Sequence, residues 1–232
     1  MNIQIGAKRW QSIIQEGAAQ LGVMVDDSAM RGFETHATEM IKFNRKINLT
    51  AITDPYGIAV KHIVDSLAAA PHLPDQVRLL DIGSGAGFPG IPLKLVRPAS
   101  AVTLIDGSVR KVSFLKHIIR QLNLEGICAC HLRAEQMAPS RNTGFNVVVS
   151  RALADLERCI QLAYPLVDKE KGIIIALRGH VAETEVTALR QLLKGRDSGH
   201  GAVENGFSLK IERFSLPFSG DQRTLVIVRC KG

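Results

Sequence analysis

The chain has 232 residues, of which 46% are hydrophobic and 22% charged, and its formal net charge is +7. This is the composition of a folded globular protein, and no apolar run reaches the ~18 residues that a membrane-spanning helix needs. The N-terminal stretch lacks the apolar core and the cleavage site of a secretory signal, so we expect a cytoplasmic protein. The positive excess falls wholly in residues 76–232, which fits a nucleic-acid partner and fits a mildly basic soluble protein equally well.

The region up to residue 75 is expected to be helical. One helix should begin near Asp27, because an apolar stripe follows it at helical spacing. A second should begin at Asp54-Pro55, where Asp can cap the helix and Pro fits its first turn. The two apolar stripes consist of Met30, Phe33, Ala37, Met40 and Ile41, and of Tyr56, Val60, Ile63 and Leu67. We therefore predict a helical N-terminal extension over residues 1–75.

From residue 76 onward, short apolar runs alternate with helical segments, of which Ser108–Leu124 has the clearest amphipathic pattern. Such alternation predicts a parallel sheet covered by helices on both faces. The last two runs, in "FSLKIERFSL" and "RTLVIVRC", follow each other with only a turn between them. A seven-stranded sheet with one antiparallel strand is expected. Its first five strands are predicted at Arg78–Ile82, Ala101–Asp106, Gly126–Leu132, Phe145–Ser150 and Gly172–Leu177.

A glycine-rich turn, "LLDIGSGAGFPG" at Leu79–Gly90, follows the first of these strands. Two registers fit it. In one, Gly85, Gly87 and Gly90 match the G-x-G-x-x-G pattern of dinucleotide-binding proteins. In the other, Asp81-x-Gly83-x-Gly85-x-Gly87 matches the loop that opens most S-adenosylmethionine-dependent methyltransferase domains. The strand is expected to stop at Gly83, which favours the second register.

Acidic side chains end the first two strands, and they bear on the choice of ligand. Asp81 would oppose a pyrophosphate but favour the ammonium and sulfonium groups of S-adenosylmethionine. Asp106 could accept both ribose hydroxyls of either ligand, so it does not discriminate between them. A glycine turn that binds nothing is the least favoured interpretation.

The end of the fourth strand indicates which atom would be methylated. Methylation of an exocyclic amine typically uses an Asn/Asp-Pro-Pro-aromatic loop there, whereas this chain has "SRALADL" at Ser150–Leu156. Methylation of a pyrimidine carbon needs a loop cysteine, but Cys159 is expected within a helix. Arg151 stays protonated and cannot serve as a general base. The acceptor should therefore need no deprotonation, as is true of guanine N7, and alignment of the reacting atoms would suffice. Arg151 could hold the donor carboxylate or contact the base, or simply pair with Asp155 on the surface.

Several stretches resemble the ribosomal RNA small subunit methyltransferase G family, also called glucose-inhibited division protein B. They are "FNRKINLTAITDP" (Phe43–Pro55), "KHIVDSL" (Lys61–Leu67), "LLDIGSGAGFPGIPL" (Leu79–Leu93), "TLIDG" with "RKVSFL" (Thr103–Leu115) and "SRA" (Ser150–Ala152). The resemblance implies a class I S-adenosylmethionine-dependent methyltransferase (Rossmann-like fold) that methylates N7 of a guanine in 16S ribosomal RNA, with residues 76–232 as the methyltransferase domain.

The resemblance also implies site residues by position. Gly83 and Phe88 would line the donor site, Ala134 and Glu135 would lie beside the adenine, and Arg151 would complete the pocket. Gly107 stands where the family more often has Ser, so a side-chain hydrogen bond is missing there. The N-terminal extension would face RNA through Lys42, Arg45, Lys46 and Asn48, while His62 and Asp65 form either a polar rim beside the acceptor or an intra-helix pair.

Four cysteines occur, and only Cys128 and Cys130 are close in sequence, beside His131. A second pair of ligands, which a zinc site needs, is missing, so we expect no metal and place these three residues in the core. A monomer acting on 16S rRNA or on the small ribosomal subunit particle is the expected form. The alternatives left open are a methyltransferase for another RNA, a protein or a small molecule, an NAD-dependent oxidoreductase, and a non-catalytic RNA-binding or assembly protein.

Overall fold

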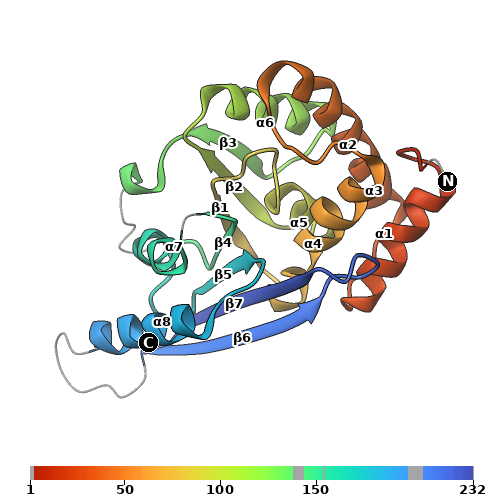
Figure 1. Cartoon of the computed structure of the whole chain (residues 1–232). Helices are drawn as coiled ribbons and strands as arrows, with labels where there is room; N and C mark the ends of the chain where they lie inside the picture. Colours follow the sequence, from red (N-terminus) through yellow and green to blue (C-terminus); the bar gives the residue numbers. More distant parts are fainter. Residues whose placement is uncertain (1–2, 138–143, 154, 198–205, 232) are drawn as a thin grey trace.

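The computed structural model describes residues 3–137, 144–153, 155–197 and 206–231. Its centre is a seven-stranded sheet in the order β3-β2-β1-β4-β5-β7-β6 (Figure 1). Strands β1 to β5 are parallel to one another, and β7 runs antiparallel to both of its neighbours. The predicted sheet with one antiparallel strand is therefore confirmed. The strands are β1 (Arg78–Ile82), β2 (Ala101–Asp106), β3 (Ile127–His131), β4 (Val147–Arg151), β5 (Ile173–Arg178), β6 (Phe207–Ser215) and β7 (Gln222–Cys230).

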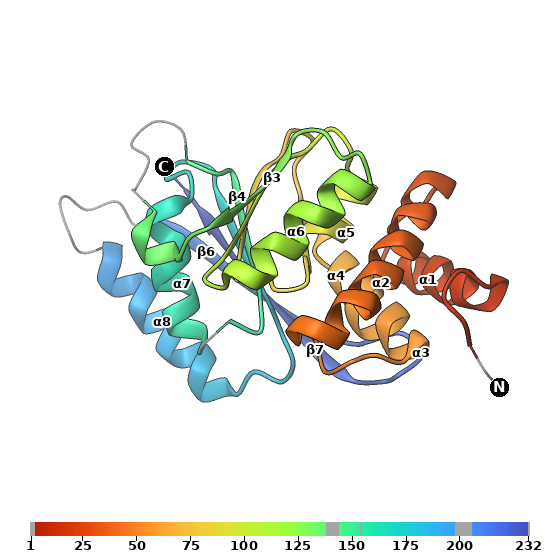
Figure 2. The ribbon, with the colours of Figure 1, turned by 90° about the horizontal axis from the view of Figure 1, so that it is seen from above.

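Helices cover both faces of this sheet, as Figure 2 shows from above. On one side lie α5 (Gly90–Val96), α6 (Val109–Gln121) and the N-terminal helices; on the other lie α7 (Leu156–Ala163) and α8 (Glu183–Asp197). Each face has its own apolar core, because successive strand residues point to opposite sides. Leu79 and Val102 belong to the first core, while Leu80 and Ile105 belong to the second.

The N-terminal region is helical, as predicted. It consists of α1 (Lys8–Gln20), α2 (Asp27–Ile47), α3 (Pro55–Gly57), the π-helix η1 (Ile58–Val64) and α4 (Asp65–Leu67). The side chain of Asp26 caps α2 by accepting from the backbone N–H of Ala29 at 2.7 Å, and Asp54 caps α3 in the same way. Three short 3₁₀ turns, η2 (Ala70–His72), η3 (Ala134–Gln136) and η4 (Tyr164–Leu166), complete the helical elements.

The segment after Asp54 differs from its predicted form, an α-helix with a single apolar face. It contains a π-helix, and Ile58, Ala59 and Val64 are buried in addition to the predicted Val60 and Ile63. Side chains all round the segment are buried because it is enclosed by other elements, including α1 and α5. The same apolar core includes Trp10 of α1 and Leu79 of β1, so the N-terminal helices and the sheet share it.

Three residues that we expected in the core are exposed: Cys128, Cys130 and His131. They lie on β3, which is an edge strand. Helix α6 covers one face of β3, whereas α7 on the other side packs on β4 and β5. The face that carries the two thiols is therefore left open. Cys159 in α7 and Cys230 in β7 are buried, as expected.

Candidate functional site

The glycine loop follows β1 directly, as the methyltransferase register requires. Gly83, Gly85 and Gly87 have φ values of 71°, 57° and 93°, a region that side chains rarely adopt. A Cβ atom on Gly87 would lie 2.4 Å from Cδ1 of Ile91, so this glycine is also required for space. The backbone N–H groups of Gly83 and Ser84 both donate to the carbonyl of Ile105 in β2. The loop is therefore built to keep its backbone close to the sheet.

Asp81 lies beneath this loop and has no exposed surface. One carboxylate oxygen, Oδ2, accepts from the N–H of Gly90 at 2.9 Å, while Oδ1 is buried without a partner. Burial raises the pKa of Asp81 to about 7. A Cβ atom on Gly90 would lie 2.7 Å from Oδ2 of Asp81 and 2.4 Å from Leu104, so Gly90 lets α5 approach the sheet. Asp81 therefore supports the loop from below and lines neither of the cavities described next.

Two cavities flank the glycine loop and share Gly83 and Lys111 in their linings. The larger, about 570 Å³, is lined by residues of the loop, of η1 and of the ends of β4 and β5. The smaller, about 350 Å³, is lined by Asp106, Gly107, Ala134, Glu135 and their neighbours. The sequence-predicted donor residues are thus divided between the two cavities: Gly83, Gly85, Phe88 and Arg151 line the larger one, and Asp106, Ala134 and Glu135 line the smaller one, while Gly87 lines neither.

The smaller cavity is suited to a nucleoside. Asp106 ends β2, and its two oxygens accept from the backbone N–H groups of Gly85 and Ser108, at 3.0 and 2.8 Å. Because a carboxylate can accept about four hydrogen bonds, it retains capacity for hydroxyl groups. Ala134 is buried, and Glu135 at the rim forms an exposed ion pair with Arg158 at 2.7 Å. Gly107 lines the same cavity, and a Cβ atom there would lie 3.4 Å from Cγ of Arg133.

Arg151, the last residue of β4, joins the sheet to the N-terminal helices. Its Nη1 donates to the carbonyl of Lys61 at 2.9 Å, and its Nη2 donates to Nδ1 of His62 at 3.1 Å. Asp65 lies 3.7 Å from Nη1 and also accepts from Nε of Arg223 in β7 at 3.0 Å. Arg151 thus pairs with Asp65, whereas Asp155 caps α7 by accepting from the backbone N–H of Arg158. The alternative of a surface pair between Arg151 and Asp155 is therefore wrong.

His62 and Asp65 both line the larger cavity, but each bonds to groups outside its own helix. Nε2 of His62 is bonded to Oγ1 of Thr50 at 2.8 Å, so both of its ring nitrogens are occupied. Burial, with Arg151 nearby, lowers the pKa of His62 to about 3, and the ring is neutral at pH 7. Burial also raises the pKa of Asp65, against the opposing effect of Arg151 and Arg223. The intra-helix pair considered above is therefore wrong.

Phe88 of the glycine loop stacks on two imidazole rings. Its centroid lies 4.6 Å from that of His62 and 4.7 Å from that of His36 in α2, and Arg151 lies over the same ring at 5.0 Å. Sequence reasoning missed His36, because it occupies one position of the buried face of α2 and no motif surrounds it. It also missed Arg223, because β7 is remote in sequence from every other member of the site.

The predicted RNA-facing residues lie at the C-terminal end of α2. Arg45, Lys46 and Asn48 are exposed, and Lys42 is close to Glu39 at 3.4 Å. Asn44, beside them, organises the loop that follows: its Oδ1 accepts from the N–H groups of Leu49 and Thr50, and its Nδ2 donates to the Thr50 carbonyl. Leu49, Thr50 and Ile52 line the larger cavity, so the basic end of α2 leads directly into it.

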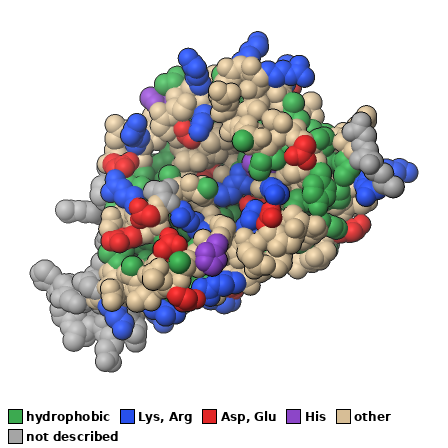
Figure 3. Space-filling model, in the orientation of Figure 1, with side chains coloured by type: hydrophobic (Ala, Val, Ile, Leu, Met, Phe, Trp, Pro, Cys, Tyr) green, Lys and Arg blue, Asp and Glu red, His purple; other side chains and the backbone are tan. Residues whose placement is uncertain are grey.

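The larger cavity is strongly basic. Its lining includes a single acidic side chain, Asp65, and five basic ones: Lys61, Lys111, Arg151, Arg178 and Arg223. Lys61 is paired with Asp221 at 2.8 Å. Figure 3 shows Lys and Arg side chains gathered near the middle of the face seen in Figure 1, with some acidic groups among them. Such a surface favours an anionic ligand.

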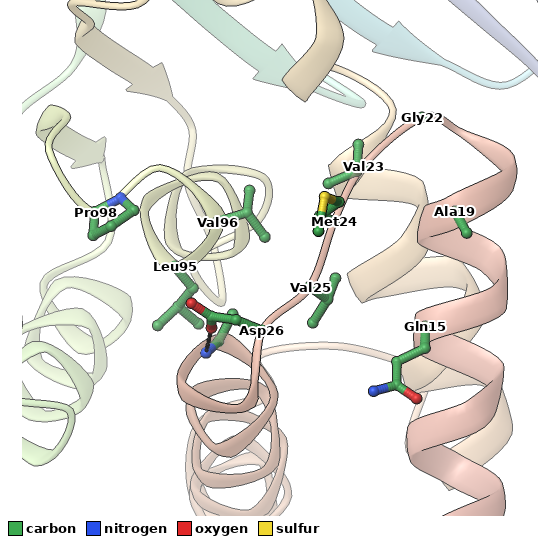
Figure 4. Close-up of a pocket in the computed structure, with 11 residues that line it drawn as sticks. Gln15, Ala19, Gly22, Val23, Met24, Val25, Asp26, Leu95, Val96 and Pro98 are labelled. Carbon is green, nitrogen blue, oxygen red and sulfur yellow. Dashed lines mark hydrogen bonds between the residues drawn. The ribbon is translucent and has the colours of Figure 1, made fainter.

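A third cavity, of about 790 Å³, lies between the α1–α2 connection and the C-terminal end of α5 (Figure 4). Its walls are mostly apolar, with Val23, Met24, Leu95 and Val96 among them. Its one acidic residue, Asp26, already caps α2. It therefore lacks the convergent polar groups of the two cavities at the glycine loop.

Two features of other functional classes are absent from the part of the chain that the structure describes. None of its helices is long and apolar enough to cross a membrane. No three His, Cys, Asp or Glu residues of this part are grouped as a metal site would require.

Taken with the strand order, the loop and its two cavities define a class I methyltransferase fold. Solved structures of this fold include TYW2 of Pyrococcus horikoshii in complex with MeSAdo, with a TM-score of 0.55 at 12% identity, covering 74% of this chain and 63% of that one. TYW2 of M. jannaschii in complex with AdoMet gives a TM-score of 0.54 at 13% identity, covering 72% of this chain and 74% of that one. At such identities the likeness shows the fold alone.

The particular family follows from sequence comparison. The model of the GidB family, described as rRNA small subunit methyltransferase G, matches residues 29–204. A protein named ribosomal RNA small subunit methyltransferase G from Geobacter sp. (strain M21) is 41% identical over 218 residues, covering 94% of this chain and 96% of its own. Its counterpart in Geobacter sulfurreducens is also 41% identical, covering 92% and 94%. The chain belongs to the ribosomal RNA small subunit methyltransferase G family, which confirms the predicted family and makes the oxidoreductase interpretation wrong.

Proposed function

We propose that this protein transfers a methyl group from S-adenosylmethionine to N7 of one guanine in 16S ribosomal RNA, as a monomer in the cytoplasm. The observation that carries the proposal is the meeting of two cavities at Gly83, one with a nucleoside-type lining and one basic. When bound, the donor supplies an electrophilic methyl group on a sulfonium. The two cavities would hold its adenosine half and its methionine half on either side of the loop.

The fit to the donor rests on chain geometry. Three loop glycines with positive φ keep side chains away from the junction, and Asp106 in the smaller cavity is available to ribose hydroxyls. Lys111 and Arg151 in the larger cavity suit a carboxylate. Asp81 lies under the loop and would act on the donor cation through the field of its carboxylate rather than by contact.

Guanine N7 as the acceptor atom is supported by the bonding of the groups around it. Arg151 stays protonated, and His62 has both ring nitrogens engaged. The oxygens of Asp65 face two arginines. None of these three groups is suited to remove a proton from the acceptor. N7 of neutral guanine has a free lone pair, so holding it in line with the methyl group and sulfur is sufficient.

Residues 1–75 would form the RNA-facing extension and residues 76–232 the methyltransferase domain. Lys42, Arg45, Lys46 and Asn48 would contact phosphates at the mouth of the larger cavity, and phosphate contacts fix register without reading sequence. His62 and Asp65 would lie beside the acceptor base in that cavity.

Incubation with donor labelled in its methyl group and with 16S rRNA, free or in the small subunit particle, tests the proposal. We expect one labelled guanine, identified as N7-methylguanine, with wild-type protein. Gly83→Asp is the matched control, because Gly83 has a φ of 71° and its Cβ would lie 3.1 Å from Leu153. Label on another base, RNA or small molecule would overturn the acceptor assignment. RNA binding without label would favour a non-catalytic assembly protein.

A further inference from the structure

We propose that His36 is a positioning residue of the donor loop, so that α2 contributes to the donor site as well as to RNA contact; this inference rests on the proposed function. His36 lies 50 residues before Ala86 of the loop, in the middle of α2, and only 1% of it is exposed. It lines neither cavity at the loop, so any effect on the donor must pass through its contacts.

The first contact is a hydrogen bond. Nε2 of His36 lies 2.7 Å from the carbonyl oxygen of Ala86, the residue between the second and third loop glycines. A carbonyl can only accept, so Nε2 carries the proton and donates. Nδ1 is then the unprotonated nitrogen, and it is buried without a partner. This hydrogen bond fixes the loop backbone at a point where glycines on both sides leave it free to change conformation.

The second contact is ring stacking. The His36 ring lies 4.7 Å from that of Phe88, at an interplanar angle of 22°, and 6.1 Å from that of Phe114 in α6. A Cβ atom on Gly87 would lie 3.3 Å from Nε2, which shows how closely the imidazole approaches the loop. His36 therefore holds residues 86 to 88 by one polar and one aromatic contact. Two of these residues, Ala86 and Phe88, line the larger cavity.

The two contacts have different chemical requirements, and substitutions can separate them. His36→Phe keeps a ring against Phe88 but leaves the buried carbonyl of Ala86 without its donor. His36→Gln keeps an N–H donor and loses the ring. Because the hydrogen bond is the contact that fixes the backbone, His36→Phe should weaken donor binding about tenfold, the value of one buried hydrogen bond. His36→Gln should retain more affinity than His36→Phe.

His117→Phe is the matched control. His117 in α6 also bonds through Nε2, to Glu39 at 2.6 Å, and its ring lies 4.6 Å from that of Phe43. The chemical change is the same, and it too affects packing between α2 and α6, but the hydrogen bond and the ring contact of His117 are to Glu39 and Phe43 of α2 and not to the loop. Donor affinity of this variant should stay within about twofold of wild type.

Calorimetric titration of each full-length variant with S-adenosylmethionine, without RNA, is the experiment, with thermal unfolding measured in parallel. A selective loss in His36→Phe, partly restored in His36→Gln, supports the assignment. Wild-type affinity in His36→Phe overturns it, whatever the unfolding temperature, and so does an equal loss in His117→Phe. If wild-type protein fails to bind the donor, the proposed function itself fails, which is a separate result. Should His36→Phe not fold, a donor affinity of His36→Gln below that of both wild type and His117→Phe supports the assignment. An affinity equal to theirs overturns it.

Discussion

Replacement of Asp81 by Asn should separate the stability of the fold from its affinity for the donor. The carboxyl group is fully buried, and its pKa is raised from its ordinary 3.8 to about 7, chiefly by burial. A raised folded-state pKa means that the folded protein binds the proton more tightly than the unfolded chain does. The stabilisation of the fold by this tighter proton binding is complete below pH 3.8 and is lost as the pH rises through about 7.

The size of this effect follows from the shift. At pH 8 the ionised carboxylate destabilises the fold by about 4 kcal/mol relative to a neutral group, because each tenfold change in the ionisation constant corresponds to about 1.4 kcal/mol. Asn can still accept from the N–H of Gly90 through its oxygen, but its amide N–H₂ takes the place of the unpartnered Oδ1. That unpaired donor costs about 1–3 kcal/mol, so a net gain of about 2 kcal/mol is expected at pH 8.

Urea unfolding of Asp81→Asn and wild type at pH 8 and pH 4 measures the difference. The variant should be the more stable at pH 8 and should lose that advantage at pH 4, where wild-type Asp81 is protonated in the folded state. Asp75→Asn, an exposed site, serves as control and should show no such crossover. Donor affinity should fall in Asp81→Asn, because the negative field under the loop is removed. Lower stability than wild type at pH 8 would refute this reasoning.

Three further outcomes are expected. Burial lowers the pKa of His36 to about 4, so its contribution to stability is present above pH 6.5 and is lost as the pH falls toward 4. Between pH 7 and pH 5, His36→Phe should therefore gain about 2 kcal/mol relative to wild type in urea unfolding; a constant difference would contradict the burial argument. Gly90→Ala should destabilise by about 1–3 kcal/mol through overpacking, whereas Gly179→Ala, with nothing within 4 Å of its added Cβ, should leave the unfolding midpoint unchanged. The double variant Arg45→Ala, Lys46→Ala should weaken RNA binding and lower its salt-dependence slope by about 1.5 in filter binding, with donor affinity unchanged; an unaltered slope would place the RNA elsewhere.

The sheet and the donor loop could be predicted because their determinants are local. Glycine spacing, the strand before Gly83 and the acid at the end of each of two strands lie within about thirty residues, and the structure has them in the expected places. The end of β4 was predicted one residue short, and the structure includes Arg151 in the strand. That position directs the guanidinium toward the N-terminal helices.

The remaining parts of the site depend on contacts between distant residues. Arg223 and Asp65 are 158 residues apart, and no pattern in the sequence links them. His36 occupies a buried position of α2 that apolar spacing alone would treat as core. Conversely, the sequence predicts Cys128 and Cys130 in the core as residues of a strand without a second pair of metal ligands, but the burial of an edge strand depends on where α7 packs. The π-helix that carries Lys61 and His62 was also not predictable, because its apolar stretch has no local pattern that distinguishes a π-helix from an α-helix.

The central claim is that this protein methylates N7 of a guanine in 16S rRNA. The most direct measurement is the mapping of N7-methylguanine in 16S rRNA from cells with the gene, without it, and complemented with wild type or Gly83→Asp. We expect one modified guanine that disappears with the gene, returns with wild type and does not return with Gly83→Asp. An unchanged map in cells without the gene would contradict the claim.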